Sequence, residues 1–248
     1  MKAWFAAAAM CMTGAMVFSV SAQTAPAATQ QPVMLDRVEA IINSNVLLQS
    51  DVDEEMRFAV LEPLRVLPGQ NTPLPAVRRL INRTLIVQQM KDQQQPVTAS
   101  GDAVAQALDE LKKQLPGCAK YHCETEEGWQ AFLSANGLTE EVVKQHWSER
   151  LAILHFIDVR FRSGIRISKE QVEDYYQKTL LPALAKSGQP APQLSAVAPR
   201  IQEILLQEEV SGLLRDWLKS LRDEGSVQIV DPAYASLGSG SAEDEGDN

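Results

Sequence analysis

Two short strand-like segments at opposite ends of the chain constrain its fold more than any other feature. Near the N-terminus, Val38, Ala40 and Ile42 fall on one face of a predicted strand. The turn residues at positions 43–45 (Asn-Ser-Asn) follow, and Val46 and Leu48 then resume the alternation, so the segment 37–48 predicts a β-hairpin. Near the C-terminus, the segment 226–230 (SVQIV) alternates in the same way.

The C-terminal strand needs a partner, because a lone strand cannot pair its own backbone N–H and C=O groups. The N-terminal hairpin is its only plausible partner, since the rest of the chain has helical periodicity. The predicted fold is therefore mostly α with a small β element. An N-terminal hairpin is completed by a C-terminal strand that follows a long helix, so the two ends of the folded core should be adjacent.

The intervening helices are predicted from apolar residues that recur at steps of three and four. Capping residues or a proline in the first turn mark where they start. Pro182 should bend the later part of the helix that begins at Ser168. The expected starts are Ser50, Pro75, Ser100, Thr125, Thr139, Ser168 and Leu194, and the last helix should end at Glu224.

The first 22 residues predict a signal peptide. Lys2 precedes an apolar run that ends in the small-residue pattern Val20-Ser21-Ala22, so cleavage is expected after Ala22. An uncleaved membrane anchor is the alternative, because the apolar run is nearly long enough to span a bilayer. Nothing later in the sequence is long and apolar enough to cross one, so no stable membrane insertion is expected after cleavage.

The mature chain is predicted to have three parts. Residues 23–34 form a flexible leader rich in Ala, Gln, Thr and Pro, and residues 35–232 form the folded domain. Within that domain, the segment 168–232 supplies the helices and the strand that complete it. Residues 233–248 are expected to be a disordered acidic tail.

Two cysteines remain after the signal, Cys118 and Cys123 in PGCAKYHCE. A closely spaced pair in an exported protein is typical of a disulfide. His122 raises the alternative of a metal site, but the three side chains supply too few ligands, and adjacent residues rarely both reach one ion. The sequence therefore predicts the Cys118–Cys123 disulfide and no metal.

Charge and motif content exclude several classes of function. With 23 Lys and Arg against 32 Asp and Glu, the net charge is −9, which disfavours nucleic-acid binding. No HExxH, Walker, GxGxxG or GxSxG motif occurs. The three histidines, at positions 122, 146 and 155, do not form a catalytic set, so no catalytic residue and no cofactor are predicted.

With these classes of function excluded, the sequence favours a protein that binds other polypeptides. Trp129 and Phe132 are candidates for contacts with a bound peptide, although an aromatic residue at helical spacing belongs more often to the core.

Several segments resemble the SurA family of periplasmic chaperones. The opening LDRVEAIINSNVLLQSDVDEEM is the most specific of them. The others are INRTLIVQQMKDQ, GLTEEVVKQHWSERL, IRISKEQVEDYYQK and the C-terminal IQEILLQEEVSGLLRDWLKSLRDEGSVQIV. The resemblance implies that the folded part of this chain corresponds to the N-terminal domain of that family. The chain departs from the family pattern in one place: residues 187–193 (SGQPAPQ) stand where the family usually carries a parvulin-type prolyl isomerase domain.

The resemblance implies an ATP-independent periplasmic chaperone, not an enzyme, because a parvulin domain of about a hundred residues cannot fit between Lys186 and Leu194. Its expected partners are non-native polypeptides, in particular outer-membrane barrel proteins. Two alternatives remain open: a prolyl isomerase, and an adaptor for one folded partner in envelope assembly.

Overall fold

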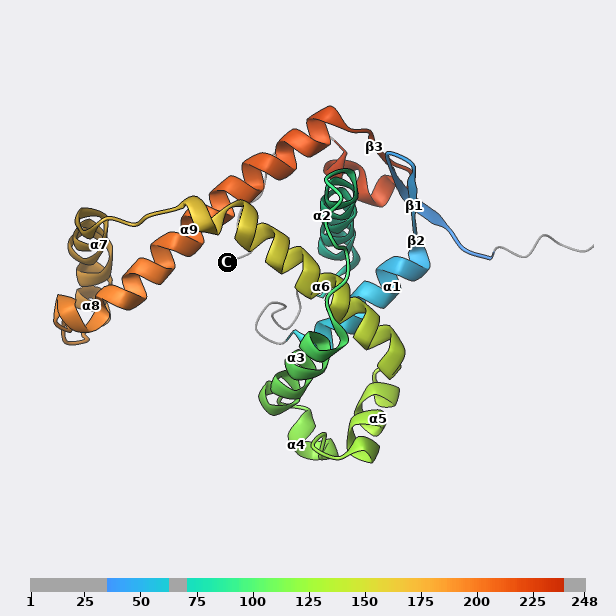
Figure 1. Cartoon of the computed structure of the whole chain (residues 1–248), viewed down its shortest axis with the longest axis horizontal. Helices are drawn as coiled ribbons and strands as arrows, with labels where there is room; N and C mark the ends of the chain where they lie inside the picture. Colours follow the sequence, from blue (N-terminus) through green and yellow to red (C-terminus); the bar gives the residue numbers. More distant parts are fainter. Residues whose placement is uncertain (1–34, 63–70, 239–248) are drawn as a thin grey trace, which may run out of the picture. The chain divides into compact units, whose positions relative to one another are not determined.

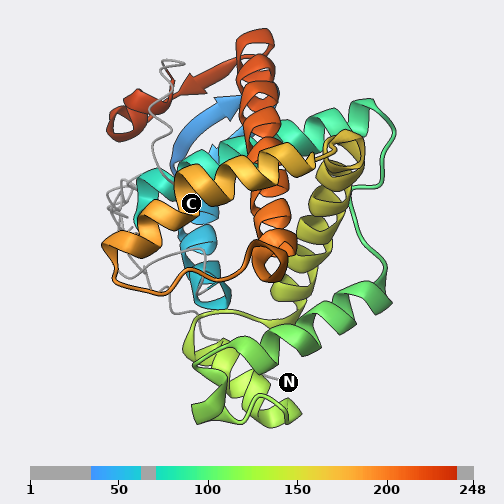
Figure 2. The ribbon, with the colours of Figure 1, turned by 90° about the vertical axis from the view of Figure 1, so that its left-hand side faces the viewer.

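A three-stranded antiparallel sheet joins the two ends of the folded chain in the computed structural model, which describes residues 35–62 and 71–238. Strands β1 (Val38–Ile42) and β2 (Asn45–Leu48) form the N-terminal hairpin. Strand β3 (Val227–Ile229) pairs with the other edge of β1, which gives the order β2-β1-β3. Figures 1 and 2 both show β3 beside β1. The predicted fold class and the closure of the two ends are thus confirmed.

The hairpin turn is itself part of this closure. Asn43 adopts a φ of 54°, the left-handed conformation that Asn tolerates in turns. Its backbone N–H donates to the carbonyl of Ser226 at 2.7 Å, and its Oδ1 accepts the Ser226 N–H at 2.8 Å. At the opposite end of the pair, the carbonyl of Glu39 accepts the N–H groups of Val230 (2.9 Å) and Asp231 (3.2 Å). The turn and both ends of β3 are therefore hydrogen-bonded into one unit.

Helices make up most of the described chain. The α-helices are α1 (Gln49–Phe58), α2 (Pro73–Asp92), α3 (Gly101–Gln114), α4 (Cys118–Tyr121), α5 (Glu126–Ala135), α6 (Glu140–Arg160), α7 (Lys169–Tyr175), α8 (Leu181–Lys186) and α9 (Leu194–Glu224). Three short 3-10 helices are η1 (Ala59–Leu61), η2 (Arg162–Gly164) and η4 (Pro232–Leu237), and a π-helical segment, η3, covers Tyr176–Leu180. Ser100, Thr125, Thr139 and Ser168 cap their helices through side-chain oxygens, as the sequence predicts.

Helix α9 has the predicted bounds, and contacts α7 and α2. Figure 2 shows its C-terminal half next to α2. Pro199 is accommodated near its beginning. Among the described residues, none of the helices combines the length and the apolar content needed to cross a bilayer.

Three details differ from the predictions. Helix α1 starts one residue before Ser50, and the carboxylate of Asp51 accepts the Leu48 N–H (2.8 Å), while Ser50 donates to Asp36 (2.5 Å). The helix expected from Ser168 is continuous, but its middle turns are π-helical just before Pro182. Proline has no N–H to donate to the preceding turn, so regular α-helical hydrogen bonding cannot continue there.

The third difference is a correction to the predicted acidic tail, 233–248. Residues 232–237 form η4, and Tyr234 is buried against the sheet, so the ordered chain extends beyond the expected boundary at Pro232. The aromatic ring is the reason, because burying it stabilises a segment that charge content alone marks as solvated. The predicted signal peptide, the leader and residues 239–248 lie outside the described residues.

In the described ranges, buried apolar side chains form three clusters. The first surrounds the disulfide between α3, α5 and α6, the second lies between the sheet, α1, α2 and η4, and the third joins α2, α6 and α9. The third contains Phe156 of α6 and Met90 of α2, with Trp217 of α9 packed against it. Phe156 also faces the groove described next, so the third cluster holds one wall of that groove in place.

Candidate functional site

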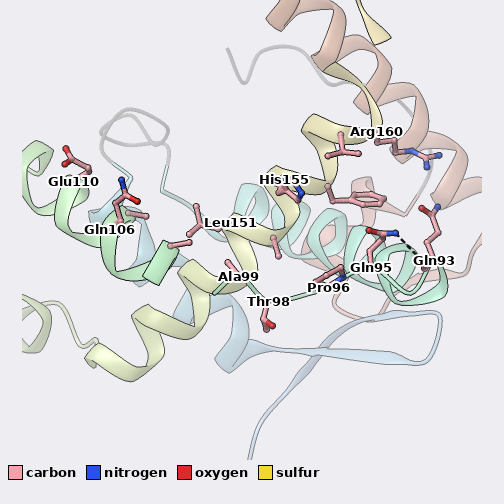
Figure 3. A pocket seen from close by; sticks show the side chains of 15 residues that line it. Gln93, Gln95, Pro96, Thr98, Ala99, Gln106, Glu110, Leu151, His155 and Arg160 are labelled. Atoms are coloured by element: carbon pink, nitrogen blue, oxygen red, sulfur yellow. Dashed lines mark hydrogen bonds between the residues drawn. The ribbon is translucent and has the colours of Figure 1, made fainter. Parts of the chain in front are cut away.

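A groove of about 860 Å³ lies between α3, α6 and the loop that joins α2 to α3. This volume is within the range of about 300 to 1000 Å³ that is typical of ligand sites. Figure 3 shows the side chains around it, with Gln106 and Glu110 of α3 at one end and Arg160 of α6 near the other. The groove is the candidate functional site.

Small side chains leave the groove hollow. Ala99, Ala103 and Ala107 follow one another at intervals of four on the α3 side, and Ala152 contributes from α6. Leu151, Phe156 and Val159 of α6 add larger apolar surface, and Val159 is 57% exposed. Alanine carries no atoms beyond Cβ, so helices α3 and α6 pack without filling the space between these positions.

The loop wall is held to α6 by one serine. The N–H of Ala99 donates to the backbone carbonyl (3.1 Å) and to the hydroxyl oxygen (3.0 Å) of Ser148, and the Ser148 hydroxyl lies 3.2 Å from the Ala99 carbonyl. The loop begins where α2 ends, with Gln94 at a φ of 54° and with the Gln95 N–H bonded to the Met90 carbonyl at 2.8 Å. This is the hydrogen-bonding pattern of a helix that ends in a left-handed residue, so the groove wall is a defined element.

Side-chain amides and a few ionisable groups line the rim. Gln93, Gln95 and Gln106 supply amides, which both donate and accept hydrogen bonds. Glu110, His155 and Arg160 are the ionisable side chains of the lining. Glu110 is paired with Lys113 at 2.7 Å, and this hydrogen bond raises the pKa of Lys113. An apolar floor with an amide rim can bind a polypeptide, because it offers apolar contact and also hydrogen bonds to a backbone.

The residues suggested by the sequence lie elsewhere. Trp129 is 1% exposed and Phe132 is 2% exposed, and their rings stack with centroids 5.6 Å apart in the first cluster. In this structure neither ring is available to a bound peptide. Of the histidines, His155 lines the groove, whereas His146 stacks on Phe58 at 3.8 Å.

Cys118 and Cys123 are joined by a disulfide, with their Cα atoms 5.0 Å apart, next to Trp129 and Phe132 in the same cluster. His122, between them, lies 3.3 Å from Glu124 and is exposed. Within the described ranges, no group of three His, Cys, Asp or Glu side chains is arranged to hold a metal ion.

The groove itself was not foreseen from the sequence. Its one signal is the alanine row at positions 99, 103 and 107, which has helical spacing but continues into the loop before α3. A row of alanines is also found where two helices pack closely. Local periodicity does not distinguish such a packed interface from an open groove.

Comparison with known proteins gives a distant similarity. No model of a known protein family matches this chain. The chaperone SurA of Vibrio cholerae serotype O1 is 28% identical to it over 160 residues, which cover 62% of this chain and 35% of that chaperone. The chain therefore spans about a third of the length of the curated relative that it matches. This similarity agrees with the resemblance seen in the sequence segments. It supports a distant relationship to SurA and does not show that the chain has the N-terminal domain of that family.

Proposed function

We propose that this protein is an ATP-independent chaperone of the periplasm that binds non-native polypeptides in the groove between α3 and α6. The groove is the observation that carries the proposal, since its apolar floor is open to solvent and framed by amides. The distant similarity to a chaperone, SurA, supports the same function. The predicted signal peptide, residues 1–22, supports the periplasmic location.

The physical basis is protection of exposed apolar segments. A chain that has not yet folded exposes apolar side chains and unpaired strand edges, and both lead to aggregation. A groove that covers such a segment through apolar contacts tolerates many sequences. No ATP motif occurs in the sequence, so release would follow from the client's own folding. Outer-membrane barrel proteins are the clients that the family resemblance favours.

The proposal contains no isomerase step. Residues 187–193 connect α8 to α9 directly, at the place where the resembled family usually carries its parvulin domain. The amide rim also favours binding of a non-native chain over the adaptor function. The amide donors and acceptors of Gln93, Gln95 and Gln106 match an extended backbone, whereas the backbone groups of a folded partner are already paired.

A matched pair of substitutions on α3 tests the function. Ala103 lines the groove and Ala105 does not, and both are exposed on the same helix. In Ala103→Trp, the indole should occupy the groove and raise the concentration needed to suppress aggregation of a urea-denatured barrel protein about tenfold, a loss of about 1.4 kcal/mol in binding. Light scattering during dilution from urea measures this.

Ala105→Trp is the control and should protect the client as well as the unmodified protein does. Circular dichroism of both variants checks that the helical fold is retained. If the two variants protect equally well, or if the unmodified protein in excess gives no protection, the proposed function is wrong.

A further inference from the structure

Arg160, a cation at the end of the groove, has no acidic partner among the described residues. Arg160 is the last residue of α6, and its guanidinium carbon lies 4.8 Å from the ring centroid of Trp217 and 5.5 Å from that of Phe161. The nearby carboxylates of Asp158 and Glu203 pair with Arg162, at 3.6 and 2.9 Å. Within the part of the chain that the structure describes, no carboxylate forms an ion pair with Arg160.

The two aromatic rings limit the movement of this guanidinium without neutralising it. A guanidinium that lies over an aromatic ring interacts through its face, and its N–H groups lie at its edge. Those N–H groups match the geometry of a carboxylate, which can accept two parallel hydrogen bonds from one arginine. The end of the groove is therefore suited to a carboxylate supplied by a bound molecule.

The remaining charges of the groove favour the same ligand. The whole chain carries a net charge of −9, yet among the described residues that line the groove Glu110 is the only one with a carboxylate, and it is paired with Lys113. Glu110 and Arg160 are near opposite ends of the groove in Figure 3. An acidic group at the Arg160 end thus meets an unpaired cation and lies away from the acidic end.

We propose that the groove prefers an extended polypeptide segment in which an apolar run lies next to an aspartate or glutamate side chain. The apolar side chains would contact Leu151 and Phe156, and the carboxylate would pair with Arg160. We assign the carboxylate to a side chain within the segment, because Gln93 and Gln95 line the groove together with Arg160, on the same side of Figure 3, and offer amides to a backbone that continues beyond the acidic residue. This inference rests on the proposed function and deepens it.

Peptide binding tests the preference. A fluorescein-labelled, C-terminally amidated peptide of ten residues, with an apolar run followed by one aspartate, is titrated with the protein beside the same peptide carrying asparagine. The aspartate peptide should bind about three- to fivefold more tightly, the range of a solvent-accessible ion pair. Raising the salt concentration should reduce this difference. A third peptide, with asparagine and a free C-terminal carboxylate, should bind like the asparagine amide.

Arg160→Gln should remove the difference between the aspartate and asparagine peptides, whatever its effect on the affinity that the two peptides share. Arg200→Gln is the matched control, since Arg200 is exposed on α9 and does not line the groove, and it should retain the preference. A thermal melt of each variant checks that loss of the contact between Arg160 and Trp217 leaves the fold intact.

The outcomes separate the two proposals. If both peptides bind equally and Ala103→Trp abolishes binding of both, the groove binds peptides but the acidic preference is wrong. If the free C-terminal carboxylate restores the preference, the carboxylate source is the chain end and our assignment is wrong. If neither peptide binds to the unmodified protein, the proposed function fails together with the inference.

Discussion

Glu55 shows at the scale of single residues how a charged group joins two helices. Its side chain on α1 is 6% exposed, and its two oxygens bind Arg79 Nε at 2.7 Å and Arg83 Nη2 at 2.6 Å, both from α2. Burial raises the pKa of Glu55, but Arg83 and Arg79 outweigh it, so the net pKa lies below the ordinary value of 4.5. Glu55→Gln should lower the free energy of unfolding at neutral pH by about 3 kcal/mol, because two partly buried arginines lose their counter-charge.

The dependence on pH has a definite sign. Since the pKa of Glu55 is lower in the folded state, its contribution is fully present above the unfolded value and is lost as the pH falls through the lower folded value. Urea unfolding at about pH 7 and about pH 3 should therefore show the difference between Glu55→Gln and the unmodified protein shrinking in acid. Glu54→Gln is the control, because Glu54 is only half-buried and its carboxylate lies 4.0 Å from the Arg57 guanidinium. An equal difference at both pH values would contradict this account.

At the scale of elements, the disulfide fixes the short connection between α3 and α5. Helix α4 ends at Tyr121 and is followed by His122, which has a φ of 57°, and the bond between Cys118 and Cys123 closes this turn within the first cluster. A loop this short restricts the unfolded chain by only about 2 kcal/mol on the loop-entropy scale. Reduction should therefore lower the free energy of unfolding by about 2 kcal/mol and leave the helical fold intact, as measured by urea unfolding with and without a phosphine reductant.

A Cys118→Ala/Cys123→Ala double variant provides the control, because its stability should not respond to the reductant. Loss of helical circular dichroism on reduction alone would mean that the fold depends on the bond. No change at all would mean that the bond does not constrain the unfolded chain.

At the scale of the whole molecule, the C-terminal segment completes the N-terminal sheet. Strand β3 pairs with β1, and Tyr234 of η4 is buried in the cluster that contains Ala40 and Ile42. A chain that ends at Gly225 lacks both elements and leaves one edge of β1 unpaired. Its free energy of unfolding should fall by about 5 kcal/mol, from the buried tyrosine and the partly buried side chains of β3.

A chain that ends at Gly238 keeps these contacts and should match the full chain in urea unfolding. If the chain ending at Gly225 also unfolds at the same urea concentration, the sheet does not depend on its C-terminal strand, and the closure of the two ends contributes nothing to stability.

Local patterns were enough to predict much of the fold. The hairpin follows from alternation and from asparagines that tolerate a left-handed turn, and the helix starts follow from Ser100, Thr125, Thr139 and Ser168. The pairing of β3 follows from the need of every strand to bond its backbone groups. Each of these inferences uses neighbours in the sequence or a requirement of the backbone, so no knowledge of side-chain packing was needed.

The candidate site depended on the tertiary structure. Apolar spacing shows which side of a helix avoids water, but it does not show which element covers that side. Trp129 and Phe132 have the spacing of a helix face and are covered by the first cluster, whereas the alanine row that includes Ala103 is left open beside α6. The sequence by itself determined the hairpin, most of the helices and the joining of the chain ends, because those follow from backbone geometry and hydrogen bonding. Only the tertiary structure decided where a groove remains, because a cavity depends on how side chains from distant segments fill the space between them.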